Sequence, residues 1–173
     1  QRELPFCIHT RYSTQQAILE DIVASLYAQG MRKLIILSGH GGNNFKGMIR
    51  DLAFVYPDFL IIAVDWFSIV PPKDYFEAVV DDHAGESETS VMMHYHPELV
   101  NLAEAGDGES KPFAIPSLNE KVGWAPRHWD KATVDSGVGN PKKASAEKGE
   151  RYMKPVVEKL SKLFTEVGQG SLY

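Results

Sequence analysis

Two short stretches carry most of the side chains that could do chemistry. The first is Ser38–Asn44 (SGHGGNN), which sets His40 among three glycines directly after the apolar run 34–37. The second is 81–90 (DDHAGESETS), which sets His83 among four carboxylates. An imidazole beside carboxylates is typical of metal-assisted hydrolysis, in which a metal generates hydroxide and a histidine moves the proton.

The glycine-rich loop has the position of a ligand-binding loop. His40 lies three residues after the apolar run, and open α/β sheets bind ligands outside the carboxyl ends of their strands. A neutral imidazole there is a good metal ligand or proton carrier. Two alternatives stay open: a turn whose histidine only caps the next helix, and a phosphate-binding loop. Against the phosphate-binding alternative, the loop lacks the Lys and Ser/Thr of a P-loop.

The acidic stretch also has a purely structural interpretation. Residues 82–87 lie at an apparent helix entry, where they could serve only as capping residues, because carboxylates stabilise a helix N-terminus. Capping accounts for one or two of the acids, but it does not account for His83 beside them. The stretch is therefore a candidate site with capping as its alternative.

The sequence predicts one α/β domain over residues 1–173. Its expected helices and strands place the stretches 38–44 and 81–90 at the ends of strands or helices. The strand–helix–strand order predicts a parallel sheet. We expect a first helix from Ser13 or Thr14, either of which could cap it, to about Gly30; its apolar stripe contains Ile18, Ile22 and Leu26 and is widened by Leu19, Val23 and Tyr27. Further helices are expected over 45–56, over 87–94 (Val91 and Met92 inward) and over 144–164 (Tyr152, Val156, Leu160 and Leu163 on one side). Strands are expected over 33–37 and 59–64, and loops with short strands over 101–140, one of them at Phe113–Ile115.

Composition excludes several classes of protein. Hydrophobic residues make up 43% and charged residues 24% of the chain, which are globular values. The formal charge of -5 argues against a nucleic-acid partner, and no apolar run approaches a membrane span. Cys7 is the single cysteine, so a reducing, cytoplasmic location is expected.

Together the two stretches resemble the creatininase family of metal-dependent amidohydrolases. The family carries a GHGGN loop after a strand, here 39–43, and further on an HAGxxETS segment, here 83–90. A weaker match is 137–141 (GVGNP) leading to 146–149 (AEKG), which resembles the family's loop into its last helix. The matches keep the family's order and extend from about residue 10 to 165.

The resemblance implies a three-layer α/β/α fold with a mainly parallel sheet, and hydrolysis of a carbon–nitrogen bond in a small, cyclic or formamide-like amide. It also implies one or two divalent metals (Zn, Mn or Fe) and a homo-oligomer, often a hexamer. By motif position His40 is a metal ligand, and His83 contacts substrate and moves a proton to the leaving nitrogen. Glu88 is a catalytic residue or metal ligand, with Glu86 weaker, and Asn43 orients the loop or binds substrate.

The sequence also departs from the family pattern. The family's other metal ligands lie in a segment with a Glu, a His two residues on and an Asp about nine further, and nothing in residues 1–39 matches it. We therefore expect the domain to be incomplete at its N-terminus. Gly42 and Val79 replace a Glu and a Trp of creatininase itself, which argues against creatinine as substrate.

For several other residues a functional role and a purely structural role are both considered. Trp66 follows a strand and is expected either to wall the substrate pocket or to pack. His94 and His96 are interpreted as helix C-terminal residues rather than ligands, and His128 as a packing residue rather than part of a lid or subunit contact. Two other functions stay open: a non-catalytic assembly module with this fold, and a phosphate- or nucleotide-binding domain.

Overall fold

The computed structural model describes residues 4–5 and 7–171. Its backbone contacts group the chain into two compact units. Unit 1 contains Pro71–Pro155 and the described residues up to His9, and unit 2 contains Thr10–Val70 and 156–171. The single domain expected over 1–173 stays a prediction.

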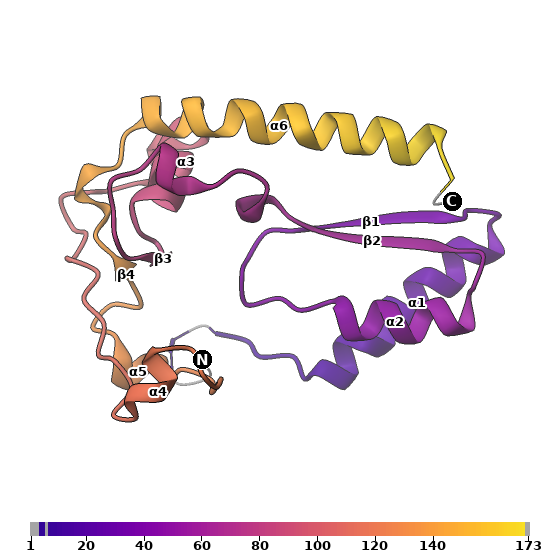
Figure 1. Cartoon of the computed structure of the whole chain (residues 1–173), viewed down its shortest axis with the longest axis horizontal. Helices are drawn as coiled ribbons and strands as arrows, with labels where there is room; N and C mark the ends of the chain where they lie inside the picture. Colours follow the sequence, from indigo (N-terminus) through magenta and orange to yellow (C-terminus); the bar gives the residue numbers. More distant parts are fainter. Residues whose placement is uncertain (1–3, 6, 172–173) are drawn as a thin grey trace. The chain divides into compact units, whose positions relative to one another are not determined.

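Unit 2 is built on a parallel strand pair. Strands β1 (Lys33–Ser38) and β2 (Leu60–Asp65) run side by side, and Ser38 pairs with Asp65 at their carboxyl ends (Figure 1). Helix α2 (Lys46–Val55) joins them and packs on β2, while α1 (Tyr12–Ala28) packs on α2. This arrangement confirms the expected βαβ unit and α/β class. It forms because apolar strands of this kind need a helix to cover their face.

The core of unit 2 differs from the expected one along α1. Leu19 and Val23 are buried, whereas Ile18 and Ile22 are 54% and 45% exposed. The predicted stripe is therefore confirmed at Leu19 and Val23 and wrong at Ile18 and Ile22, because the periodicity of a largely apolar helix does not by itself fix which of its apolar residues turn inward. The buried cluster comprises Leu19, Val23, Met48, Leu52, Phe59 and Ile61.

The ends of α1 show one wrong and one confirmed prediction. The helix begins at Tyr12, so its cap residue is Arg11, two or three residues before the expected cap, and Arg11 makes no capping bond through its side chain. The cap predicted at Ser13 or Thr14 is therefore wrong. Gly30 has a φ of +86°, and its N–H donates to Tyr27 O, which confirms the predicted glycine after the C-terminus.

Unit 1 contains a second, antiparallel strand pair that the sequence did not predict. Strand β3 (Asp81–His83) pairs with β4 (Val138–Gly139), and helix α3 (Glu86–Tyr95) follows β3. The pairing places Val138 opposite His83 and so joins two of the sequence motifs. The short helices are η1 (Trp66–Ser68, in unit 2), η2 (Pro72–Asp74), η3 (Pro97–Leu99), α4 (Pro116–Asn119), α5 (Trp129–Ala132) and η4 (Pro141–Lys143).

Two further expectations for unit 1 are wrong. Phe113–Ile115 forms no strand. Instead, the Asn119 side chain accepts from the N–H of Phe113 and donates to its carbonyl, so both backbone groups have hydrogen-bond partners without a neighbouring strand. Met92 is exposed on α3, and the residues buried there are Glu86 and Ser90. His96 ends α3 as expected, but its ring pairs with Glu98.

Helix α6 (Ala146–Gln169) is the longest element, and its predicted inner face is confirmed at Tyr152 and Val156, which are 1% and 0% exposed. In unit 2, Lys33 Nζ donates to the carbonyls of Val167 and Gly170 at 2.6 Å each, and so binds the end of this helix. Among the described helices, none has both the length and the apolarity to cross a bilayer.

Candidate functional site

The glycine-rich loop of unit 2 is held by its own polar groups. His40 is exposed, and its Nδ1 accepts a 2.9 Å hydrogen bond from Gly42 N–H, while its carbonyl accepts from Asn43 N–H. Buried Ser38 donates to the His40 carbonyl at 3.2 Å and accepts from Asn43 Nδ2 at 3.4 Å. Two of the loop's N–H groups are therefore used inside the loop, which disfavours the phosphate-binding alternative.

Trp66 lies at this same edge of the sheet. Its indole Nε1 donates to the Gly39 carbonyl at 3.4 Å, and its ring meets Phe67 edge-on at 5.9 Å. The strand ends bring Trp66 beside the loop, as its position after β2 predicts. Whether Trp66 contacts substrate stays a prediction, as does substrate binding by Asn43, whose observed partner is Ser38.

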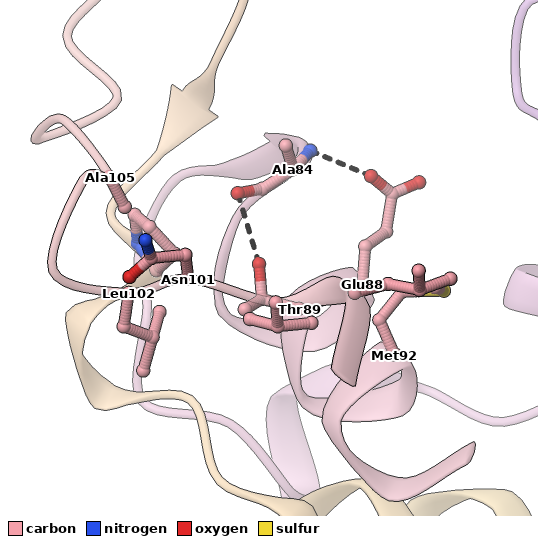
Figure 2. Close-up of a pocket in the computed structure, with 10 residues that line it drawn as sticks. Ala84, Glu88, Thr89, Met92, Asn101, Leu102 and Ala105 are labelled. Atoms are coloured by element: carbon pink, nitrogen blue, oxygen red, sulfur yellow. Dashed lines mark hydrogen bonds between the residues drawn. The ribbon is translucent and has the colours of Figure 1, made fainter. Parts of the chain in front are cut away.

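The turn between β3 and α3 in unit 1 has an unusual backbone. Ala84, next to His83, adopts a φ of +49°, a left-handed conformation that costs a non-glycine residue about 1–2 kcal/mol. Glu88 Oε2 accepts from Ala84 N–H at 2.7 Å, and Thr89 Oγ1 donates to the Ala84 carbonyl at 3.2 Å (Figure 2). Two side chains near the start of α3 thus hydrogen-bond the backbone N–H and the carbonyl of Ala84.

The same contacts bring the two catalytic candidates of unit 1 together. His83 Nδ1 lies 4.0 Å from Glu88 Oε2, and the two side chains are 28% and 34% exposed. This separation exceeds a hydrogen bond, so the two side chains are neighbours, and Glu88 bonds instead to the peptide of the next residue, Ala84. An imidazole next to a carboxylate, partly open to solvent, is suited to moving a proton.

The other carboxylates of the stretch are structural. Asp81 accepts hydrogen bonds from Ser87 N–H at 3.1 and 3.3 Å and so caps α3, and its burial raises the pKa of its carboxyl. Glu86 is fully buried, accepts from the N–H groups of Glu77 and Ala78, and pairs with Lys148 at 2.5 Å. The carboxylate that bonds the start of α3 is thus Asp81, one position before the expected capping stretch 82–87, and Glu86 is a buried anchor.

The anchor belongs to a small ion-pair network. Lys148 also lies 3.0 Å from Glu77, which Lys143 approaches at 2.8 Å. Hydrogen bonds from Lys143 and Lys148 lower the pKa of Glu77 to about 2, and the bond to Glu86 raises the pKa of Lys148. These ion pairs connect the segment that follows η2, the end of η4 and the first turns of α3 and α6.

Sequence reasoning missed the aromatic neighbour of His83. The indole of Trp129 meets the His83 ring at 5.0 Å in an edge-to-face arrangement, and the Arg127 guanidinium lies 4.8 Å from the centre of that indole. His128, by contrast, is exposed, so its expected packing role is wrong. The sequence signal was the aromatic stretch 124–129, but nothing in it pointed to His83.

A pocket of about 330 Å³ adjoins the β3–α3 turn on the surface of unit 1 (Figure 2). Its walls share Ala84, Glu88 and Thr89 with the turn. The remaining lining residues are mostly apolar: Met92, Leu99, Val100, Asn101, Leu102, Ala105 and Pro141.

The metal-ligand candidates do not form a metal site by themselves. Among residues 4–5 and 7–171, no group of three or more His, Cys, Asp or Glu side chains could hold an ion. His40 belongs to unit 2 and Glu88 to unit 1, and His40 Nδ1 already accepts from Gly42. Zinc sites use three or four protein ligands, so these two residues alone do not fit such an ion.

A family profile described as creatininase, creatinine amidohydrolase, matches residues 1–164. The chain therefore belongs to the creatininase family, as the two motifs indicate. It is 83% identical to a Bacteroides fragilis NCTC 9343 protein of known crystal structure that is assigned as a creatinine amidohydrolase. That superposition has a TM-score of 0.97 and covers 100% of this chain and 68% of the other.

More distant relatives have different described activities. The chain is 31% identical over 131 residues to the mycofactocin precursor peptide peptidase of Mycobacterium ulcerans (strain Agy99), covering 73% of this chain and 45% of that protein. It is 23% identical to the creatinine amidohydrolase of Pseudomonas putida, covering 89% and 63%. The chain thus spans about half to two thirds of these relatives' length.

A solved creatininase variant described as of Zn-Zn type shares the fold. The TM-score is 0.75 at 22% identity, and the superposition covers 95% of this chain and 67% of that one. The similarity confirms the creatininase-like fold.

Proposed function

We propose that this chain belongs to a hydrolase that cleaves a carbon–nitrogen bond of a small amide. The observation that supports this most directly is the pairing of His83 with Glu88 across the strained Ala84 turn, in a chain of the creatininase family. The distant relatives described as acting on creatinine and on a precursor peptide both fit amide substrates.

In this proposal the chain's own residues handle protons. As a water oxygen bonds to the amide carbon, His83 takes a proton from that water; the carbon–nitrogen bond then breaks, and His83 gives the same proton to the leaving nitrogen. Glu88 places a carboxylate oxygen 4.0 Å from His83 Nδ1 and holds the adjacent Ala84 peptide through its hydrogen bond. Asn43 and Trp66, in unit 2, are proposed substrate contacts.

A divalent metal (Zn, Mn or Fe) is part of the proposal, supported by the relative described as of Zn-Zn type. His40 is its proposed ligand on this chain, and Glu88 is a second candidate. Because the described residues do not complete a ligand set, the remaining ligands would have to come from elsewhere. We also propose a homo-oligomer, with a hexamer as the expected size, in a reducing cytoplasm.

The test is an amide panel (creatinine, N-formyl amines and short peptides) read by mass spectrometry for hydrolysed product. We expect turnover of one class, lost in His83→Gln and kept in His96→Gln, whose exposed ring lies 3.1 Å from Glu98 and has no assigned role in the chemistry. Turnover unaffected by His83→Gln would contradict the assigned role. No turnover of any class would favour the non-catalytic module.

Metal content is measured separately by elemental mass spectrometry. We expect Zn, Mn or Fe in the purified chain, or taken up on soaking, and less of it in His40→Ala. A chain that binds none of these ions under either condition would contradict metal dependence. Light scattering on the same sample gives the oligomeric state.

A further inference from the structure

The loop that carries Arg127 and Trp129 is bound to two consecutive residues of β3. The Arg127 guanidinium lies 2.7 Å from Asp82 Oδ2, and the Trp129 indole lies against the next residue, His83. Arg127 also lies over the Trp129 ring at 4.8 Å, so the two loop side chains contact each other as well as the strand. The side chains therefore contact one another in the order Asp82, Arg127, Trp129 and His83, and the first and last of them are neighbours on β3.

The backbone behind Trp129 is fixed independently of these contacts. Its carbonyl accepts from Thr133 Oγ1 at 2.7 Å and from Thr133 N–H at 3.0 Å. Thr133 is bridged to Ser110, and Lys111 N–H donates to the Ala132 carbonyl at 2.7 Å. The short helix α5 is thereby hydrogen-bonded to the segment at Ser110 and Lys111, which fixes the backbone position of Trp129.

We propose that Trp129 is a positioning residue for His83, with Arg127 as the brace that holds the indole. An imidazole that is 28% exposed on a three-residue strand can rotate about χ1 and χ2 unless a neighbour blocks it. The edge-to-face ring contact restricts that rotation, and the Asp82–Arg127 pair keeps the indole in place. The catalytic consequence rests on the proposed function, whereas the ring contact does not.

The first experiment measures position rather than activity. Carbon–proton correlation spectra of the folded chain report the imidazole resonances, with His83 assigned from the signal lost in His83→Gln. In Trp129→Leu we expect the His83 ring resonances to lose the indole ring current and to move much more than those of His40 and His96. Trp124→Leu, in the same loop but 86% exposed, should leave them in place.

Two milder variants keep the test decisive if Trp129→Leu does not fold. Trp129→Phe keeps an aromatic face and should retain a smaller ring-current shift, and Arg127→Gln should move the His83 resonances part of the way. His83 resonances that do not respond to any of these three substitutions would overturn the proposal.

Where the amide panel finds a substrate, kinetics add a second readout. We expect Trp129→Leu to lower kcat by up to about 100-fold with little change in KM, because a misplaced proton donor costs rate rather than binding. Trp129→Phe should recover most of the loss. Absence of any substrate would contradict the proposed hydrolase, and the spectra would still decide whether Trp129 positions His83.

Discussion

Glu88 Oε2 accepts a 2.7 Å hydrogen bond from the N–H of Ala84, and the same oxygen lies 4.0 Å from His83 Nδ1. One carboxylate therefore stabilises a strained peptide and faces a candidate proton carrier. The structural and the chemical contribution of Glu88 can be separated, because the hydrogen bond needs an acceptor and the second contact needs a charge.

Glu88→Gln keeps an acceptor for Ala84 and removes the charge. We expect a thermal unfolding midpoint close to that of the parent chain and a loss of about 100-fold or more in kcat on the substrate found by the amide panel. Glu88→Ala should lower both stability and turnover. Glu98→Gln, at an exposed glutamate of the same unit, is the matched control. Full activity in Glu88→Gln would contradict a role for the charge.

Ala84 has a left-handed backbone that glycine adopts without cost. We expect Ala84→Gly to be neutral or slightly stabilising, and Ala84→Val to destabilise by about 1–3 kcal/mol, because a β-branched side chain is strained at this φ. Urea denaturation measures both. Equal stability of the two variants would show that the turn relaxes to another conformation.

The sheet and the long helices could be predicted because their signals are local and repeated. Apolar runs followed by a glycine-rich loop or by Asp65-Trp66 placed both strand ends at one edge, and the structure pairs Ser38 with Asp65 there. The GHGGN and HAGxxETS stretches identified the family for the same reason, since each is a short contiguous pattern. Which residues of the broad apolar stripe on α1 turn inward was not local information: Leu19 and Val23 are buried, whereas Ile18 and Ile22 are exposed.

The neighbours of His83 could not be predicted. Strands β3 and β4 contain three and two residues, too few to show a period, and they pair across a long stretch of loops. The contact of Trp129 with His83 depends on that pairing and on the hydrogen bonds that fix the backbone of α5. Burial of Glu86 depends on Lys148, a partner on another helix, so its charge alone suggested a functional residue.

Gly149 marks a close approach between α6 and α3. A Cβ at this position would meet the carbonyl oxygen of Ser90 at 2.1 Å, and a backbone atom has little freedom to move away. We expect Gly149→Ala to destabilise unit 1 by about 1–3 kcal/mol. Gly168→Ala, on the same helix with nothing within 4 Å, should instead stabilise by roughly 0.5–1 kcal/mol. Calorimetry of both variants tests the contrast, and a stabilising Gly149→Ala would refute the tight packing.

Lys148 compensates the buried charge of Glu86. Its side chain is 21% exposed and that of Glu86 is 0% exposed, so Lys148→Met leaves an anion in the interior without its cation. We expect a destabilisation of up to about 3 kcal/mol, of which Glu86→Gln in the same chain should recover part. Lys143→Met, which removes an exposed partner of Glu77, should cost much less. A double variant no better than Lys148→Met would argue against the pairing.

Asp81 makes the stability depend on pH in an unusual direction. Its carboxyl titrates near 3.8 in the unfolded chain, and burial raises its pKa in the folded chain. Between these two pKa values the folded state binds more protons, so the free energy of unfolding falls as the pH rises from 3.8 through the folded value. Glu77 acts oppositely: it contributes stability above its ordinary pKa of 4.5, and that contribution is lost as the pH falls toward about 2.

Asp81→Asn isolates this effect, because the amide oxygen can still accept from Ser87 N–H and Glu77 is unchanged in both proteins. We expect the variant to lack the decline that Asp81 causes above pH 3.8, so the stability difference should shift in its favour as the pH rises. Urea midpoints of both proteins, measured from pH 3 to 7 alongside the exposed-site control Asp130→Asn, give the comparison. Parallel pH profiles for Asp81→Asn and the parent chain would show that desolvation of this carboxylate does not matter to stability.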